Sequence, residues 1–230
     1  MIKGKTMRDG KNLLIFDLDG TLIDSVPDLA AAVNATLVDI GRAPFDEDTV
    51  RHWVGNGATM LVARALSGAL TVDDNLPEAT LQDALARFFA HYRAHTCVRT
   101  QAYAGVNEGL QTLKNAGYTL TMVTNKPFEF IAPIVQAMGW QDRFAISLGG
   151  DSLPTKKPDP APLRHVCQQL NIAPQHAYMI GDSKNDILAG KNAGIDTLGL
   201  SYGYNYGQDI REQQPTAAFD SFAEMVAFLT

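Results

Sequence analysis

Four groups of polar residues in this sequence could do chemistry together. They are Asp17 with Asp19, Thr124 with Asn125, Lys156 with Lys157, and Asp182. Carboxylates that lie close together repel one another unless a cation lies among them, and a hard, oxygen-binding ion such as Mg²⁺ fits that need. A lysine and a threonine hydroxyl beside the ion would suit a phosphate dianion. The residue types therefore indicate phosphoryl transfer, in which positioning and charge neutralisation are the main devices.

Each group follows a segment that we expect to be a strand of a buried parallel sheet. Continuous apolar runs are typical of such strands, and they cover residues 13–16, 120–123, 144–148, 177–180 and 197–200. Helix-like segments alternate with them, at about residues 106–116, 129–138, 161–170 and 185–193. This alternation predicts an α/β fold with a doubly wound, Rossmann-like parallel sheet. Ligands of such sheets bind beyond the carboxyl ends of the strands, so the polar groups should converge on one crevice.

Residues 25–100 interrupt the alternation of strands and helices. They contain no convincing strand, and apolar residues recur in them at helical spacing. Ser25 and Asp28 are placed as a capping box at the start of the first helix. We therefore predict a catalytic core of residues 1–24 and 101–230 and an inserted all-helical cap of residues 25–100, which is the size of a small domain.

The composition limits the classes of partner. The chain has 230 residues, is 46% hydrophobic and carries a formal net charge of -6. The acidic balance, without a clustered basic surface, argues against nucleic acid as a partner. No apolar run approaches the ~20 residues of a membrane helix, and residues 1–12 lack the apolar segment of a signal peptide. We expect a cytoplasmic protein without a membrane partner, either a monomer or a homodimer.

Four segments resemble, in the correct order, the four signatures of the haloacid dehalogenase superfamily in its phosphatase form. They are Asp17–Leu22, Thr124–Lys126, Lys157–Pro160 and Gly181–Asp186, and they span nearly the whole chain. Two less specific segments, Val54–Gly57 and Tyr202–Gly207, are similar to those of bacterial phosphoglycolate phosphatases. The resemblance implies hydrolysis of a small phosphomonoester, with 2-phosphoglycolate as the favoured substrate.

The resemblance also implies the roles of the acidic residues. Asp17 matches the nucleophile that becomes an aspartyl phosphate. Asp19 matches the general acid that protonates the leaving alkoxide and then the base that activates water. Asp17, Asp182 and the backbone carbonyl of Asp19 match the ligands of Mg²⁺, and Asp186 matches a supporting carboxylate behind them.

The phosphate-binding groups follow from the same resemblance. Thr124, Lys157 and the backbone N–H of Asn125 match the groups that hold the phosphoryl oxygens. Lys157 is preferred to its neighbour Lys156 because it directly precedes the proline of the signature, although either ammonium could serve as the point charge. Gly20 gives the backbone room to approach a ligand, and the N–H groups there could form an anion nest.

Some residues have two interpretations. Asp151 follows a predicted strand and could belong to the site or be an ordinary loop carboxylate. The loop Gly55-Asn56-Gly57 could contact the organic part of the substrate or be an ordinary turn between helices. The tyrosines at positions 202, 204 and 206 are not assigned to the substrate.

Three functions remain to be distinguished. The first is hydrolysis of a small phosphomonoester, with the cap closing over the crevice on hinges near residues 22–25 and 100–105 and excluding water. The substrate could also be a sugar phosphate, pyrophosphate or a nucleotide, because fold analogy does not choose among them. The second is a phosphomutase, and the third is a phospho-acceptor such as a signalling receiver, which has no need of a leaving-group acid or a lid.

Overall fold

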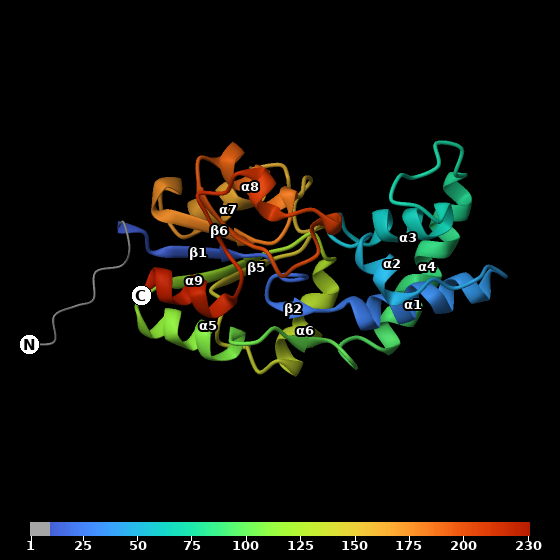
Figure 1. The fold of residues 1–230 in the computed structure, drawn as a ribbon, viewed down its shortest axis with the longest axis horizontal. Helices are drawn as coiled ribbons and strands as arrows, with labels where there is room; N and C mark the ends of the chain where they lie inside the picture. Colours follow the sequence, from blue (N-terminus) through green and yellow to red (C-terminus); the bar gives the residue numbers. More distant parts are fainter. Residues whose placement is uncertain (1–9) are drawn as a thin grey trace, which may run out of the picture.

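The structure is a computed structural model that describes residues 10–230, and the sequence-based expectation about residues 1–9 lies outside them. Within the described residues a parallel six-stranded sheet has the strand order β5-β4-β1-β6-β7-β8 (Figure 1). Its strands are β1 Leu13–Phe16, β4 Thr119–Val123, β5 Ile146–Leu148, β6 Ala177–Gly181, β7 Asp196–Leu200 and β8 Ala217–Phe219. The predicted doubly wound parallel sheet is confirmed. Only the short edge strand β8 had no counterpart among the predicted strands of this sheet.

Helices cover both faces of the sheet, because its central strands are apolar on both sides. In β1, Leu14 and Phe16 pack into one apolar cluster, whereas Leu13 and Ile15 pack into another. The first cluster is completed by α5 (Val106–Asn115), α6 (Ile131–Ala137) and α9 (Phe222–Leu229), and the second by α7 (Ala161–Gln169) and α8 (Lys184–Ala193). Short 3₁₀ helices lie at η2 Phe128–Phe130, η3 Pro174–His176, η4 Asn205–Gly207 and η5 Ile210–Gln213.

The segment between residues 25 and 100 is helical, as predicted, and no strand lies in this described stretch. It contains α1 (Val26–Asp39), α2 (Glu47–Arg51), α3 (Ala58–Ser67) and α4 (Glu78–Ala94), which lie to one side of the sheet (Figure 1). We call this helical segment the cap. It has its own apolar cluster, which Phe130 and Tyr204 join from outside the cap. None of the described helices is both long and apolar enough to span a bilayer.

A short antiparallel ribbon lies where the cap leaves and rejoins the rest of the chain. Its strands are β2 (Ile23–Asp24) and β3 (Gln101–Ala102), which the sequence analysis did not predict. The ribbon coincides with the predicted hinge positions and with the predicted boundaries at residues 24/25 and 100/101, and both the hinges and the boundaries remain predictions.

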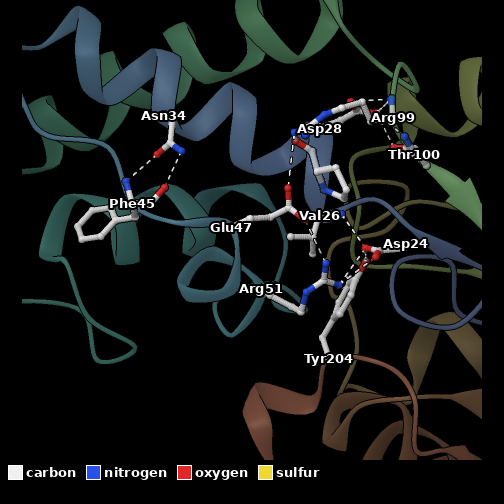
Figure 2. Close-up of polar contacts among 11 residues, drawn as sticks. Asp24, Val26, Asp28, Asn34, Phe45, Glu47, Arg51, Arg99, Thr100 and Tyr204 are labelled. Atoms are coloured by element: carbon white, nitrogen blue, oxygen red, sulfur yellow. Dashed lines mark hydrogen bonds and ion pairs between the residues drawn. The ribbon is translucent and has the colours of Figure 1, made fainter.

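The predicted capping box of Ser25 and Asp28 is wrong. Ser25 Oγ instead donates to Asp19 Oδ1 at 2.5 Å, and the carboxylate of the preceding residue, Asp24, accepts from the first helical N–H, that of Val26. Asp28 accepts hydrogen bonds from the backbone N–H groups of Arg99 and Thr100 and from the Thr100 hydroxyl (Figure 2). Asp28 therefore joins the two ends of the cap. Its place near the start of a helix suggested a local capping role instead.

A second polar contact joins the cap to the loop after β7. The Tyr204 hydroxyl accepts from Ser25 N–H at 2.9 Å and donates to Asp24 Oδ1 at 2.9 Å. Arg51, from α2, approaches the same carboxylate at 3.0 Å and lies over the Tyr204 ring (Figure 2). Tyr204 thus has a structural role at the root of the cap.

Candidate active site

The parallel register of the central strands brings the predicted site residues together. Phe16, the last residue of β1, is level with Met122 in β4 and with Ile180 in β6. The next backbone N–H, that of Asp17, donates to Ile180 O at 2.9 Å. The chain therefore leaves adjacent strands at the same edge of the sheet, at Asp17, Thr124 and Asp182.

Three buried carboxylates meet at this edge. Asp17, Asp182 and Asp186 each offer an oxygen atom, and these oxygen atoms lie within 4.8 Å of one another. Lys157 Nζ lies 2.9 Å from Asp17 Oδ1 and 2.6 Å from Asp186 Oδ1. Both Asp186 oxygens have protein partners: Oδ1 accepts from Lys157 Nζ, and Oδ2 accepts from the N–H and Oγ–H of Ser183, the N-cap residue of α8. This arrangement fits a supporting position for Asp186 rather than a direct ligand.

The Asp182 side chain packs closely against two glycines, Gly20 and Gly203. An added Cβ at Gly20 would lie 2.3 Å from Asp182 Oδ2, and one at Gly203 would lie 2.2 Å from Asp182 Cβ. Thr21 Oγ1–H donates to Asp182 Oδ1 at 2.7 Å, and Tyr204 N–H donates to Oδ2 at 2.8 Å. The space at Gly20 is therefore filled by a protein carboxylate. Its N–H donates to Ile23 O, so this N–H is not free to bind an anion, and a nest formed by the other N–H groups of this loop stays a prediction.

Burial raises the pKa values of two of the clustered carboxylates, those of Asp17 and Asp182. Burial, together with the charge of Asp186, raises the pKa of Asp17 to about 7 against the lowering effect of Lys157. Burial and the charges of Asp186 and Asp17 raise the pKa of Asp182 to about 8. Burial alone would lower the pKa of Lys157, but its two carboxylate neighbours outweigh burial and raise it.

The cluster has the charge and donor types of a divalent metal site. Three ionised aspartates and one lysinium carry a formal charge of -2, which a divalent cation would cancel. Carboxylate oxygens are the ligands that Mg²⁺ prefers. The residues present therefore fit a hard divalent ion.

The two adjacent lysines face different neighbours. Lys157 is buried between Asp17 and Asp186, whereas Lys156 Nζ donates to the backbone carbonyl of Asn56 in the cap. The geometry therefore puts the Lys157 ammonium, and not that of Lys156, beside the predicted nucleophile.

Asp19 lies in a different environment from the three clustered carboxylates. It accepts from Ser25 Oγ and is paired with Lys126, whose Nζ lies 3.0 Å from Oδ1 and 3.2 Å from Oδ2. Lys126 is 3% exposed, and its Nζ lies 4.8 Å from the centroid of the Tyr92 ring in α4. The sequence analysis gave no role to Lys126 beyond its place in a signature. Its position two residues after Thr124 was the one signal that could have identified it.

The residues around Thr124 connect the site to the cap. Thr124 Oγ1 accepts from Lys126 N–H at 3.2 Å. Asn125 Nδ2 donates to Lys157 O at 2.9 Å and to Gly55 O in the cap at 3.2 Å. The cap loop at residues 55–57 therefore lies against the site, although its contact with a substrate stays a prediction. Asp151 accepts from Phe128 N–H in an exposed loop, which agrees with its ordinary interpretation.

A small pocket lies between the cap and the carboxyl edge of the sheet. Asp17, Asp19, Thr124, Asn125 and Lys126 form its polar side. Its apolar side comes mainly from the cap and includes Leu29, Val54, Leu61, Phe88, Tyr92 and Phe130. Phe88 and Tyr92 are buried in the apolar cluster of the cap and also line this pocket. The volume open to the centres of water-sized molecules is about 40 Å³.

Comparison with known proteins identifies the family. A family model described as haloacid dehalogenase-like hydrolase matches residues 14–200. A phosphoglycolate phosphatase of Psychrobacter arcticus is 60% identical over 220 residues, which are 95% of this chain and 96% of that protein. One from Colwellia psychrerythraea is 52% identical over 95% of this chain and 97% of that protein.

Solved structures agree with the sequence comparison. The crystal structure of a predicted phosphoglycolate phosphatase from Haemophilus somnus superposes with a TM-score of 0.90 at 38% identity, covering 97% of this chain and all of the other. The fold, the order of the signature segments and the sequence identity thus support the same family assignment. The chain belongs to the haloacid dehalogenase-like hydrolase family.

Proposed function

We propose that this protein is a Mg²⁺-dependent phosphatase that hydrolyses 2-phosphoglycolate to glycolate and inorganic phosphate. The observation that carries the proposal is the placement of Asp17. Its carboxylate lies beside the buried Lys157 ammonium and the acidic cluster, and it faces a pocket that also contains Asp19. The identity to proteins named phosphoglycolate phosphatase, which extends over nearly the whole chain, supports the substrate.

The first chemical step would transfer the phosphoryl group to the protein. An oxygen of Asp17 attacks phosphorus while the bond from phosphorus to the glycolate oxygen breaks. Asp19, in its protonated form, gives a proton to that departing oxygen. The Lys157 ammonium and the hydroxyl of Thr124, which keeps its own hydrogen to donate, stabilise the charge on the phosphoryl oxygens.

The second step would regenerate the nucleophile. Asp19, now ionised, takes a proton from a water molecule whose oxygen attacks phosphorus, and the bond between phosphorus and Asp17 breaks. Asp17, Asp182 and the Asp19 backbone carbonyl would hold Mg²⁺, with Asp186 supporting them and orienting Lys157. When bound, the metal would supply positive charge to the phosphoryl group and balance the buried carboxylates.

The size of the pocket favours a small organic group. About 40 Å³ is open to the centres of water-sized molecules, and a single water needs about 10–15 Å³ of that measure, so the pocket has room for only a few atoms. Glycolate contributes two carbon atoms and a carboxylate, whereas a sugar or a nucleoside would displace the apolar side of the cap. This limit favours 2-phosphoglycolate over the larger phosphomonoesters.

Phosphate release from a panel of phosphomonoesters, with Mg²⁺ and with chelator, tests the function. We expect the highest kcat/KM for 2-phosphoglycolate, lost in chelator and restored by Mg²⁺. Broad, weak hydrolysis of the panel would contradict the substrate, and retention of the phosphate on the protein without turnover would point to a phospho-acceptor. Asp17→Asn keeps the shape of the side chain but removes the attacking charge, and substantial Mg²⁺-dependent turnover in this variant would refute the mechanism.

A further inference from the structure

Lys126 is buried at the pocket, and the mechanism above gives it no task. Its Nζ contacts both oxygens of Asp19, at 3.0 and 3.2 Å, and faces the Tyr92 ring. Of the described residues that line the pocket, it alone carries a positive charge. An ammonium removed from water at a ligand pocket needs an anionic partner.

The chemistry of 2-phosphoglycolate fixes where its carboxylate must lie. A single methylene carbon separates the leaving oxygen from the carboxylate. Asp19 must approach the leaving oxygen to protonate it, so the group that binds the carboxylate must be a direct neighbour of Asp19. Lys126 is such a neighbour, and lysine has three N–H donors to share between two carboxylates.

We propose that Lys126 is the specificity residue that binds the carboxylate of the substrate, moving from a full pairing with Asp19 to one shared with the bound ligand. The inference rests on the proposed function and extends it to the recognition of the organic group. It also explains how Asp19 can be held in an ion pair without substrate and still act on the leaving oxygen. An arriving carboxylate competes for Lys126 and weakens its hold on Asp19.

The cap contributes to this recognition through Tyr92 and the apolar wall. Tyr92 is 1% exposed, and the centroid of its ring lies 4.8 Å from Lys126 Nζ. Phe88, Leu29 and Leu61 also line the pocket. In such poorly hydrated surroundings an ammonium and a carboxylate attract each other more strongly than in water. A neutral substrate of the same length would leave the Lys126 charge without that second partner.

Two substrates of matched length test the proposal. They are 2-phosphoglycolate and 2-hydroxyethyl phosphate, in which a neutral CH₂OH group replaces the carboxylate. The quantity measured is the ratio of their kcat/KM values in the wild type, Lys126→Met and Lys126→Gln, with Lys191→Met as a distant lysine control. Lys126→Gln keeps a donor for Asp19 and provides a folded variant if the methionine protein is unstable.

We expect the preference for 2-phosphoglycolate to fall roughly 30-fold or more in both Lys126 variants, the effect of removing one partner of a buried charge pair. Inhibition by glycolate should weaken in parallel while inhibition by inorganic phosphate changes little, and Lys191→Met should match the wild type. If Lys126 only positions Asp19, both substrates will lose rate equally, and an unchanged ratio overturns the proposal. If the wild type does not hydrolyse 2-phosphoglycolate, the proposed function itself is wrong.

Discussion

The two adjacent lysines allow a matched test of how the acidic cluster is held together. We predict that Lys157→Met destabilises the protein and abolishes turnover. Lys156→Met should have a much smaller effect on both stability and turnover. Lys157 Nζ is buried within 2.9 Å of Asp17 and 2.6 Å of Asp186. Lys156 is exposed, and its Nζ donates a hydrogen bond to the carbonyl of Asn56.

The expected magnitudes follow from these environments. Removing one partner of a buried ion pair costs about 3–5 kcal/mol, because the remaining charges are left buried without compensation. Removing a single partly exposed hydrogen bond costs about 1 kcal/mol. Urea unfolding of the two variants at pH 8, without added metal, should therefore separate them by roughly 2–4 kcal/mol.

The pH dependence adds a second, independent check. The pKa of Asp17 is already raised from its ordinary value of 3.8 to about 7, and the charge of Lys157 opposes that rise. The contribution of Asp17 to stability is therefore fully present below about pH 4 and lost as the pH rises through 7. Loss of Lys157 raises the pKa of Asp17 further, so the destabilisation should be largest above pH 7 and should shrink towards pH 5. Equal destabilisation by the two methionine substitutions, or one that does not change with pH, would refute this reasoning.

Three further predictions concern the metal, the glycine packing and the root of the cap. Mg²⁺ competes with protons at Asp17 and Asp182, whose pKa values are raised to about 7 and 8. The affinity of the protein for Mg²⁺, measured by calorimetry, should therefore rise between pH 6 and 8.5. An affinity that does not change with pH would contradict those shifts. Gly203→Ala would place Cβ 2.2 Å from Asp182 Cβ and should lower Mg²⁺ affinity and kcat/KM together by about tenfold or more, the range seen when groups supporting a metal ligand are altered. A Mg²⁺ affinity equal to that of the wild type would show that the loop containing Gly203 can move away from Asp182. Tyr204→Phe removes the acceptor of the buried Ser25 N–H and should lower the free energy of unfolding by about 1–3 kcal/mol in urea titrations, whereas no change would mean that water replaces the hydroxyl.

The sequence alone determined the type of fold and most of the edge at which the site lies. Apolar runs that end in polar residues predicted β1, β4, β6 and β7 nearly to the residue. Burial on both faces requires such runs, so this information is local. The boundary of β5 was less accurate, and β8 was missed, because each has only three half-buried residues.

The four signature segments likewise predicted which residues would meet. Asp17, Thr124 and Asp182 come together because parallel strands in register end at one edge of the sheet, and Lys157 reaches Asp17 from the loop between β5 and α7. That rule depends only on the strand type and the order of elements, both of which the sequence contains. Their catalytic roles remain proposals, which the substitutions above test.

Tertiary structure alone decided the contacts between residues far apart in the chain. Local propensity favoured a capping box for Ser25 and Asp28, but Asp28 binds residues 71 and 72 positions away. Lys126 pairs with Asp19 across 107 positions, and Tyr204 reaches Ser25 across 179. Such pairs leave no periodic pattern, because their geometry depends on how the cap packs against the sheet. The same packing separates Lys157 from Lys156: it buries one ammonium between two carboxylates and leaves the other beside a cap carbonyl.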